Sequence, residues 1–423
     1  MPHILLLLPT ATYRGEAFLE AARKLNISVT IGCEQAGRWE NSPSGAVLLL
    51  DFQNLKASQD RVAQFAKAHP LNGIIGVEDN TTFIAASLSS FLGLPHHSPK
   101  AASAARNKLE MRTLLQESKI HIPPFKAFSI HVDPAKIANR IQYPCVVKPL
   151  ILSASCGVIR ADAPESFCRA FTRVKRLLNQ LGLVEKEKAA QSLLVEDFIP
   201  GTEVAIEGIL TRGNLTVLAL FDKPDPLNGP FFEETIYLTP SRLPLKVQDQ
   251  IADTLQQAAR ALGLAEGPVH GELRINTEGV WVIELAGRSI GGRCSQILQF
   301  GSGITLEELI LRHALRLEIP TFEREEQAVG VMMLPIKQLG YFQNIKGQSE
   351  ARNTPGITCL EITAKPGDLL VPLPEGTRYL GFLSAKGRTP HEVERSLRQA
   401  YRFLQVETTP IPGESPKMGV LRI

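Results

Sequence analysis

The sequence predicts an α/β protein that is built from three units. Over residues 1–97, short apolar runs alternate with helix-like segments, which is the pattern of parallel βαβ units. A second, α+β unit is expected over 98–320, because Ser98 followed by Pro99 is a typical helix start. Beyond it, strand-like pieces separated by Pro-Gly turns predict a small α+β C-terminal unit over 321–423.

Composition and charge restrict the class of function. The 423 residues are 44% hydrophobic and 21% charged, as in ordinary globular proteins. A net charge of +3 gives no basic face for nucleic acid or membrane. No stretch reaches the ~18 apolar residues of a membrane span, and the run Ile4 to Leu8 is too short for a signal sequence. Six scattered cysteines without a CxxC pair favour a reducing compartment, so we expect a cytoplasmic protein.

The first unit is expected to place polar residues at one edge of its sheet. The polar clusters 10–14 and 78–80 each follow a predicted strand, and ligands of parallel sheets bind beyond the carboxyl ends of strands. Turns and helix caps explain the same clusters equally well. No GxGxxG follows the first strand, so a dinucleotide site is not expected. Strands are predicted at 4–8, 28–31, 46–50 and 73–77, with helices at 15–25, 60–69 and 81–92.

The second unit is expected to begin with one helix that carries Arg106, Asn107 and Lys108. The proline-rich stretch 222–230 cannot lie in a central strand, so it is predicted to be a long functional loop. Strands are predicted at 145–148, 158–160, 193–196, 203–210 and 215–221, helices at 164–181, 245–262 and 305–317, and a hairpin at 269–286.

The hairpin carries the most informative pattern in the chain. Two alternating runs flank Thr277-Glu278-Gly279, and a three-residue loop that ends in glycine pairs Asn276 with Val280. Counting outward from that pair places Glu272 directly opposite Glu284. Alternation then predicts a core face of Leu273, Ile275, Trp281, Ile283 and Leu285, and an opposite face of His270, Glu272, Arg274, Val282 and Glu284.

Two directly opposed carboxylates repel each other, and three explanations are open. Glu272 and Glu284 are exposed to solvent and tolerated, or they are neutralised by Arg274, or they are bridged by a divalent cation. Oxygen ligands from one or two carboxylates, completed by substrate phosphates, are typical of Mg²⁺ sites.

The residues from Glu284 to Gly292 decide which family the chain resembles. Glu284-Leu-Ala-Gly-Arg288-Ser-Ile-Gly291-Gly292 resembles the E-x-N-x-R-x-x-G-G signature of ATP-grasp enzymes. Lys108 and Lys148 resemble the two phosphate-binding lysines of that superfamily, and 194–203 resembles its hinge strand. The similarity covers about 99–317, and 1–97 resembles the Rossmann-like domain that precedes the ATP-grasp domain.

Within the superfamily, the Asp222-Lys-Pro224 loop and the Ala-Gly-Arg form after Glu284 favour the carboxylate-amine or L-amino-acid ligases (dipeptide synthetases) over carboxylases. This resemblance implies an enzyme that forms an amide bond through an acyl phosphate and releases ADP and phosphate. ATP is then the co-substrate, Mg²⁺ or Mn²⁺ the metal, and amino acids the expected substrates. A homodimer is a further expectation, since relatives are often dimers.

The resemblance also implies roles for individual residues. Glu272 and Glu284 would hold the metal. Of the two expected catalytic residues, Arg288 would stabilise the transferred phosphoryl group or the acyl phosphate, and Lys148 would contact the α- and β-phosphates. Substrate contacts are expected from Glu78, Glu233, Glu234, His270 and Arg274. An ordinary strand start explains Glu233 and Glu234 equally well, and a core position or a place behind the metal ligands explains His270 equally well. ATP contacts are expected from Lys108, Lys148, Ser153, Ser155, Gly157, Glu196, Phe198, Ile199 and Glu203, of which Glu203 would bind the ribose hydroxyls.

Two features depart from the family pattern. Ala286 replaces the usual asparagine, and the phosphate loop Leu150–Gly157 has a single glycine. Two other functions therefore remain open: an ATP-grasp enzyme of the carboxylase or carbamoyl-phosphate type, and an ATP-binding regulator without turnover. The sequence leaves the role of 321–423 open between a lid, a dimer surface and a wall of the substrate pocket.

Overall fold

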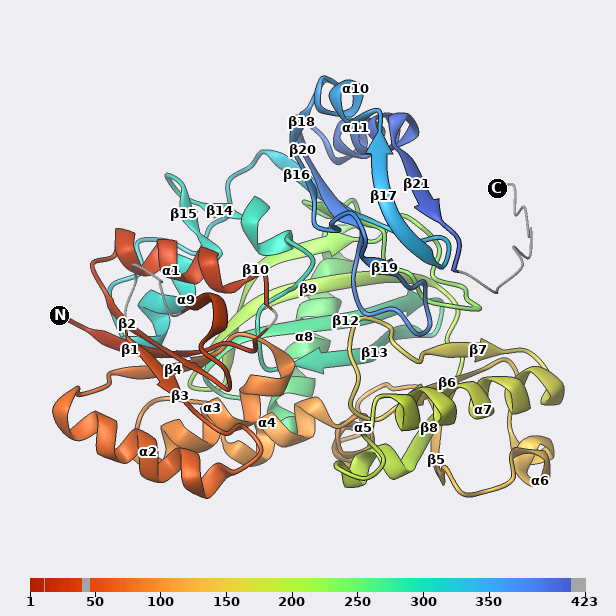
Figure 1. The fold of residues 1–423 in the computed structure, drawn as a ribbon, viewed down its shortest axis with the longest axis horizontal. Helices are drawn as coiled ribbons and strands as arrows, with labels where there is room; N and C mark the ends of the chain where they lie inside the picture. Colours follow the sequence, from red (N-terminus) through yellow and green to blue (C-terminus); the bar gives the residue numbers. More distant parts are fainter. Residues whose placement is uncertain (11, 40–45, 412–423) are drawn as a thin grey trace.

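The fold is described from a computed structural model, which covers residues 1–10, 12–39 and 46–411. Residue 11 of the polar 10–14 cluster and residues 412–423 of the C-terminal unit lie outside the described residues. In Figure 1 the N-terminal domain lies at the lower left, a small body at the lower right, and a large curved sheet lies between them and continues into the C-terminal region at the top. The predicted α/β class is confirmed.

The N-terminal domain is a parallel sheet in the order β3-β2-β1-β4. The interior of β1 is fully apolar, and Ile4 to Leu8 are buried, as a central strand covered on both faces requires. The carboxyl ends of β1 and β4 lead into the polar residues that were expected there. The elements are β1 (His3–Leu7), α1 (Gly15–Lys24), β2 (Ser28–Cys33), η1 (Gly37–Trp39), β3 (Val47–Leu49), α2 (Leu55–Ala68), β4 (Gly73–Gly76) and α3 (Asp79–Leu92).

Two short helices lead out of this domain. The single helix predicted across residues 106–108 is in fact two helices, α4 (Pro99–Arg106) and α5 (Lys108–Glu117). Asn107 ends α4 and caps α5, because its side chain accepts hydrogen bonds from the Leu109 and Glu110 backbone N–H groups. Lys108 is therefore the first residue of a helix.

The small body (residues 125–197) is an antiparallel sheet in the order β5-β8-β6-β7, covered by α7. Phe167, Phe171 and Val174 recur at helical spacing on α7 and pack on this sheet. Strand β5 was not predicted. The elements are β5 (Phe125–Ser129), α6 (Pro134–Ile137), η2 (Ala138–Arg140), β6 (Cys145–Pro149), β7 (Ile159–Ala161), α7 (Pro164–Gln180), η3 (Lys188–Gln191) and β8 (Ser192–Asp197).

The large sheet has the strand order β13-β12-β9-β10-β11-β16-β20-β18. On one face Ile251, Leu255 and Leu262 of α8 pack against Val204 and Leu273 of the sheet. Its elements up to residue 314 are β9 (Thr202–Thr211), β10 (Asn214–Asp222), β11 (Ile236–Thr239), α8 (Leu245–Leu262), β12 (Gly267–Asn276), β13 (Gly279–Ala286), η4 (Cys294–Ile297), β14 (Gln299–Phe300), β15 (Ile304–Thr305) and α9 (Leu306–Ala314).

The C-terminal region continues the large sheet, since β16 pairs with β11 across the boundary expected near residue 320. Val393, Leu397 and Ala400 of α11 pack on this extension. The elements are β16 (Ala328–Leu334), β17 (Gly340–Lys346), α10 (Gln348–Arg352), β18 (Ile357–Ile362), β19 (Leu369–Leu370), β20 (Gly381–Gly387), α11 (Pro390–Phe403) and β21 (Gln405–Thr409). Among the described residues, the helices are too short or too polar to cross a membrane.

Candidate active site

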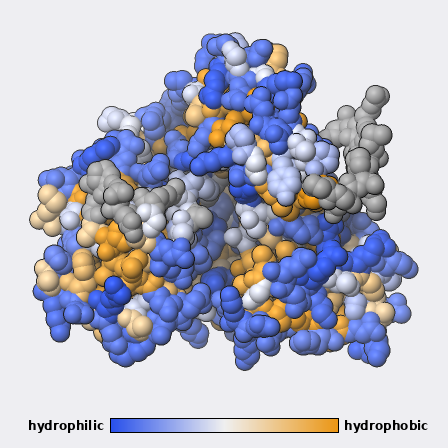
Figure 2. Space-filling model, viewed as in Figure 1, coloured by the Kyte–Doolittle hydropathy of each residue, from blue (hydrophilic) through white to orange (hydrophobic). Residues whose placement is uncertain are grey.

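A cavity of about 700 Å³ lies where the N-terminal domain, the small body, the large sheet and the C-terminal region meet. Figure 2 shows this face of the molecule hollowed near its centre, with mostly hydrophilic side chains around the hollow. The predicted site residues line the cavity, except Gly157 and Glu233. Glu233 instead lines a smaller cavity beside it. The fold thus brings residues that lie more than 200 positions apart in the sequence together around one cavity.

The hairpin formed by β12 and β13 places Glu272 opposite Glu284, as predicted, but by a different route. The predicted three-residue loop is wrong, because Asn276 pairs with Gly279 and only two residues form the turn. A β-bulge then skips Ile283, since Glu272 pairs with Glu284 whereas Leu273 pairs with Val282. The shorter turn and the bulge compensate each other, and the two carboxylates end in the expected register.

The shorter turn and the bulge also change which side chains face the core: the turn shifts Trp281 and Val282, and the bulge displaces Ile283. Val282, expected on the polar face, is fully buried with Leu273 against α8. Ile283, expected in the core, lines the cavity. Trp281, also expected in the core with Leu273, lies on the other face of β13, where its ring stacks on His121 at 3.4 Å between centroids. The predicted faces of these three residues are therefore wrong.

Glu196, at the end of β8, is the anion between two buried cations. Arg112 Nε donates to Glu196 Oε1 at 2.6 Å, and Lys148 Nζ lies 2.5 Å from Glu196 Oε2. Burial alone would raise the pKa of Glu196, but Arg112 and Lys148 outweigh burial and lower it. Glu196 lines the cavity, where it is expected to contact ATP, and its side chain holds Lys148 in place at the cavity wall.

Arg112 was missed by the sequence analysis, although it is fully buried. Its second terminal nitrogen donates to the Ile283 carbonyl at 2.6 Å, so it joins α5 to the hairpin as well as to β8. Arg112 lies one helical turn after Lys108, and this i, i+4 spacing on α5 was a signal that both cations share one helix face.

Lys108 connects the phosphate loop with the hairpin. Its Nζ donates to the Leu152 carbonyl at 2.8 Å and lies 3.5 Å from Glu284 Oε1. Ser153 and Ser155 line the cavity from the same loop. Gly157 is buried behind the loop with φ +73°, and its N–H donates to the Pro374 carbonyl rather than into the cavity.

Glu203 on β9 is bound by two cations, which occupy its carboxylate. Lys223 Nζ donates to Glu203 Oε1 at 2.9 Å, and Arg274 Nε donates to Glu203 Oε2 at 2.8 Å. Arg274 also donates to the carbonyls of Ile199 and Leu227. Arg274 was expected to contact substrate, but these bonds engage its guanidinium in joining β12 to the chain on either side of β9.

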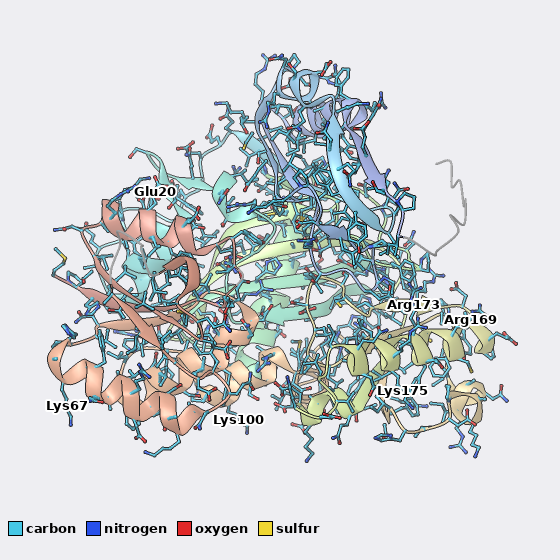
Figure 3. The ribbon with its side chains drawn as sticks, viewed as in Figure 1. Glu20, Lys67, Lys100, Arg169, Arg173 and Lys175 are labelled. Atoms are coloured by element: carbon cyan, nitrogen blue, oxygen red, sulfur yellow. The ribbon has the colours of Figure 1, made fainter. Side chains whose placement is uncertain are left out.

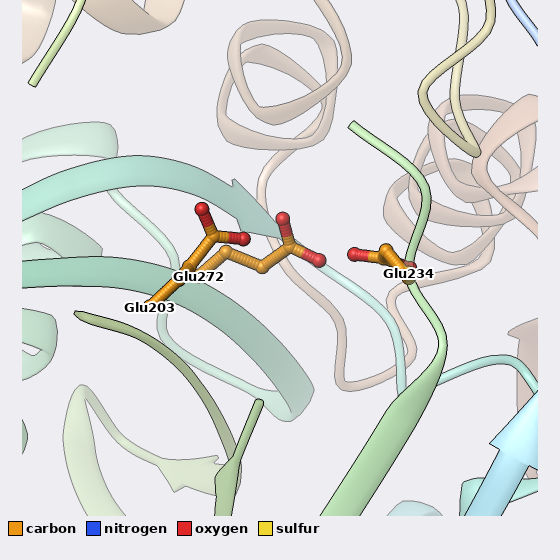
Figure 4. Close-up of side chains that lie close together, drawn as sticks. All are labelled: Glu203, Glu234 and Glu272. Atoms are coloured by element: carbon orange, nitrogen blue, oxygen red, sulfur yellow. The ribbon is translucent and has the colours of Figure 1, made fainter. Parts of the chain in front are cut away.

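Figure 4 shows that Glu203, Glu234 and Glu272 converge from different segments. One ligand oxygen from each lies within 4.8 Å of the others, an arrangement that is suited to a cation. Lys223 Nζ provides that cation, at 2.9, 2.7 and 3.2 Å from the three carboxylates. Burial, followed by Glu272, raises the pKa of Glu234 to about 6 although Lys223 opposes the rise.

The opposed pair Glu272 and Glu284 fits a divalent cation better than this triad does. The side chain of Glu284 is about one-third exposed, and its Oε1 lies 3.5 Å from Lys108 Nζ. Both side chains line the cavity and offer carboxylate oxygens, the donors that Mg²⁺ and Mn²⁺ prefer. Ala286, at the position of the family's asparagine, also lines the cavity but has no donor atom in its side chain.

Arg288 reaches across to the N-terminal domain. Its Nε and one terminal nitrogen donate to the two oxygens of Asp79, each at 2.8 Å. Glu78, the neighbour of Asp79, accepts a hydrogen bond from Thr12 Oγ1 at 2.7 Å and lies 3.7 Å from Arg14. The cluster predicted at 78–80 therefore forms one wall of the cavity.

Glu207 is a further buried acid, and the sequence analysis gave it no role. It is fully buried, and its Oε2 accepts a hydrogen bond from the Ile290 N–H at 2.9 Å. His270 lies between Glu207 and Glu272, with its ring nitrogens 3.5 and 3.6 Å from their carboxylates. Burial raises the pKa of Glu207. Glu207 thus fixes the turn that follows Arg288.

Aromatic side chains from both ends of the chain close the cavity. Tyr13 accepts a hydrogen bond from the Gly292 N–H at 2.7 Å, and its ring lies 5.8 Å from that of Phe382. Tyr379 and Phe382 line the cavity from the C-terminal region. Of the three roles left open for 321–423, the structure supports a wall of the pocket.

Comparison with known proteins identifies the domains. A family model described as an ATP-grasp N-terminal domain matches residues 19–96, an ATP-grasp domain matches 141–297, and an L-amino acid ligase C-terminal domain matches 332–409. The crystal structure of L-amino acid ligase from Bacillus licheniformis superimposes with a TM-score of 0.80 at 25% identity, covering 97% of this chain and 99% of that chain.

Curated relatives carry related names. Alanine–anticapsin ligase of Bacillus subtilis (strain 168) is 25% identical over 273 residues, which is 60% of this chain and 57% of that protein. Carnosine synthase 1 of Homo sapiens is 27% identical over 294 residues, 65% of this chain and 35% of that protein. The match thus spans about half or less of these two relatives. With the domain matches and the full-length structural match, these findings confirm the predicted family: the chain belongs to the ATP-grasp superfamily and is a ligase with the domain arrangement of the L-amino acid ligases.

Proposed function

We propose that this ligase joins the carboxylate of one amino acid to the amine of another, through an acyl phosphate, and releases ADP and phosphate. The observation that carries the proposal is the cavity in which Lys108 and Lys148 face the carboxylate pair of the hairpin and Arg288. The ligase names of the relatives support the same bond type. Free cysteines throughout the chain support a cytoplasmic enzyme, and a homodimer stays a prediction.

ATP is proposed to lie between the small body and the large sheet. Phe198 and Ile199, which follow β8, give the cavity an apolar end that suits adenine. Lys148 is held rigidly by Glu196, and Lys108 approaches from the opposite side, so both ammonium groups suit a triphosphate. Ser153 and Ser155 add hydroxyl donors. Glu203 keeps its proposed place near the ribose, with Lys223 and Arg274 fixing its carboxylate.

Glu272 and Glu284 are proposed to hold the divalent cation, Mg²⁺ or Mn²⁺. Bound there, the cation would neutralise phosphate charge and make the γ-phosphorus easier to attack. Lys223 Nζ lies 3.2 Å from Glu272 and orients its carboxylate from one side, while Lys108 Nζ lies 3.5 Å from Glu284 and orients that carboxylate. The side chains of this site are therefore already arranged before the nucleotide binds.

The reaction is proposed to run in two steps. An oxygen of the substrate carboxylate attacks the γ-phosphorus, the bond to the β–γ bridging oxygen breaks, and ADP leaves. The amine nitrogen of the second substrate then attacks the carbonyl carbon, phosphate leaves, and the nitrogen loses a proton. Arg288, oriented by Asp79, is placed to stabilise the charge on the phosphoryl group.

Substrate recognition is proposed within the main cavity and the smaller cavity beside it. Glu78 and Glu234 offer carboxylates there for an α-ammonium group, and His270 lies beside the metal pair. Glu233 is proposed to act from the adjoining cavity, because it does not line the main one. Arg274 is proposed to support this wall through Glu203 rather than to touch substrate.

The proposal is tested by measuring ADP release from Mg-ATP with single amino acids and with pairs, and by identifying the product by mass spectrometry. ADP release that requires two amino acids, together with a dipeptide product, is expected. Bicarbonate-dependent release without an amine would replace the proposal with carboxylation. Tight ATP binding without release under any condition would indicate a regulator.

A further inference from the structure

The phosphate loop is held from behind by a segment of the C-terminal region, residues 371–379. The Gly157 N–H of the loop donates to the Pro374 carbonyl at 2.8 Å. The neighbouring thiol of Cys156 lies 3.9 Å from the Glu375 carbonyl. Two consecutive residues of the loop thus contact two consecutive residues of a segment that lies more than 200 positions further along the chain.

The same segment is joined to helix α7 of the small body by an ion pair. Arg173 donates from Nε and a terminal nitrogen to the two oxygens of Glu375, at 2.6 and 2.8 Å. The guanidinium also lies 5.2 Å from the centre of the Phe231 ring. In Figure 3 Arg173 lies on the side of α7 that is nearer the C-terminal region, whereas Lys175 points away from it. A planar bidentate contact fixes direction as well as distance.

The opposite side of the segment faces the active-site cavity. Thr377, Arg378 and Tyr379 line the cavity, directly after Glu375 and Gly376. The segment is tightly folded, because the Gly376 N–H donates to the Pro372 carbonyl at 2.9 Å and a Cβ at this position would lie 2.0 Å from the Val371 carbonyl oxygen. A displacement of Glu375 is therefore expected to move the residues of the same segment that line the cavity, Thr377 to Tyr379.

We propose that Glu375 is a positioning residue for the phosphate loop. Through Arg173 and the Pro374 carbonyl, the 371–379 segment holds the loop over the triphosphate and links it to the wall that faces the substrates. The inference rests on the proposed function, because it takes residues 150–157 as the phosphate loop. It adds that the ATP site is incomplete without the C-terminal region.

The experiment measures Mg-ATP binding directly, by calorimetry, in Glu375→Gln, Arg173→Gln and the double variant. Each single variant is expected to weaken binding about three- to tenfold, since the pair is bidentate but partly exposed. The double variant is expected to bind Mg-ATP no more weakly than the single variants, because the same contact is lost in all three proteins. Arg169→Gln, exposed on the same helix, is the matched control and is expected to bind as the parent does.

Two readouts separate positioning from general loss of structure. Hydrogen exchange of residues 153–158 is expected to accelerate in Glu375→Gln while exchange in α8 stays unchanged. In steady-state assays KM for ATP is expected to rise more than kcat falls. Unchanged binding and exchange in both single variants, or losses that multiply in the double variant, would overturn the inference and leave the ligase proposal standing. Absence of Mg-ATP binding by the parent protein would instead refute the proposed function.

Discussion

Arg288 and Asp79 lie 209 residues apart and form a bidentate ion pair, with both contacts at 2.8 Å. Asp79 begins α3 of the N-terminal domain, whereas Arg288 follows the last strand of the hairpin. Burial alone would raise the pKa of Asp79, but Arg288 outweighs burial and lowers it. The pair is therefore ionised at neutral pH, and the N-terminal domain fixes the direction of the arginine that is proposed to act on the phosphoryl group.

Asp79→Asn is expected to lower both stability and turnover. The substitution leaves the buried guanidinium without its counter-charge, which costs about 1–3 kcal/mol of unfolding free energy. The proposed ligase activity is expected to fall by about two orders of magnitude, because misplaced catalytic groups lose that much. Thermal unfolding and ADP release measure the two effects.

Asp60→Asn serves as the control for that substitution. Asp60 pairs with Lys56 on α2, and both side chains are well exposed, so no measurable change is expected. An Asp79→Asn protein with unchanged turnover would show that Asp79 does not orient Arg288 in the reaction.

Glu284→Gln is expected to abolish turnover while the fold is retained. The amide keeps the shape of the side chain but removes the charge that is proposed to bind the cation, and we expect a loss on the order of 10²- to 10³-fold. Glu272→Gln is expected to act in the same direction. Glu278→Gln, in the exposed turn of the same hairpin, is the matched control. Titration of Mn²⁺ in the presence of ATP, followed by paramagnetic resonance, measures metal affinity; unchanged affinity in both variants would contradict the assignment.

The fold class could be predicted from the sequence because periodicity is a local signal, whereas the Glu272–Glu284 pairing was predicted correctly only because the shorter turn and the bulge offset each other. The bulge at Ile283 could not be predicted, since a single skipped residue leaves the hydrophobic pattern almost unchanged. The faces of Trp281 and Val282 were predicted wrongly because the turn has two residues rather than three, which shifts their register by one. Strand β5 was missed because its five residues are half-exposed and show no clear alternation.

The connections between charged residues were the least predictable part of the site. Arg112, Lys223 and Glu375 find their partners through long-range contacts, which the local sequence does not specify. Arg274 and Glu196 line the cavity, and their roles toward ligands stay predictions, while their side chains also form ion pairs within the protein. Their residue types suit ligand binding, but the fold supplies protein partners first.

Arg112→Met is expected to destabilise the protein strongly. Arg112 is fully buried, and the substitution leaves Glu196 with Lys148 as its remaining cation and the Ile283 carbonyl without this donor. Removing one partner of a buried ion pair typically lowers the unfolding free energy by about 3–5 kcal/mol. Denaturation in urea measures the loss. Arg112→Lys keeps the charge but loses the hydrogen bond to the Ile283 carbonyl. Its stability is expected to lie between that of the parent and that of Arg112→Met. Equal stability of parent and Arg112→Met would show that the network does not stabilise the fold.

Glu234 is expected to make stability depend on pH in a direction opposite to that of a typical salt-bridged carboxylate. Burial, then Glu272, raises its folded-state pKa to about 6 from the usual 4.5, against the opposing effect of Lys223. The folded protein therefore binds the proton more tightly than the unfolded chain does. This contribution to stability is fully present below pH 4.5 and is lost as the pH rises through 6.

Glu234→Gln resembles the protonated side chain and is expected to remove this dependence. As the pH rises from 4.5 to 6.5, the variant should therefore gain stability relative to the parent, by on the order of 1–2 kcal/mol of unfolding free energy. Urea unfolding at several pH values measures the difference, with Glu278→Gln as the exposed control, whose difference from the parent is expected to stay constant. A constant difference for Glu234→Gln as well would mean that the pKa of Glu234 is the same in the folded and unfolded states, so that Lys223 offsets the effects of burial and Glu272. The acidic triad around Lys223 would then carry one more negative charge at pH 5, and the α-ammonium of a substrate would meet a more strongly anionic wall.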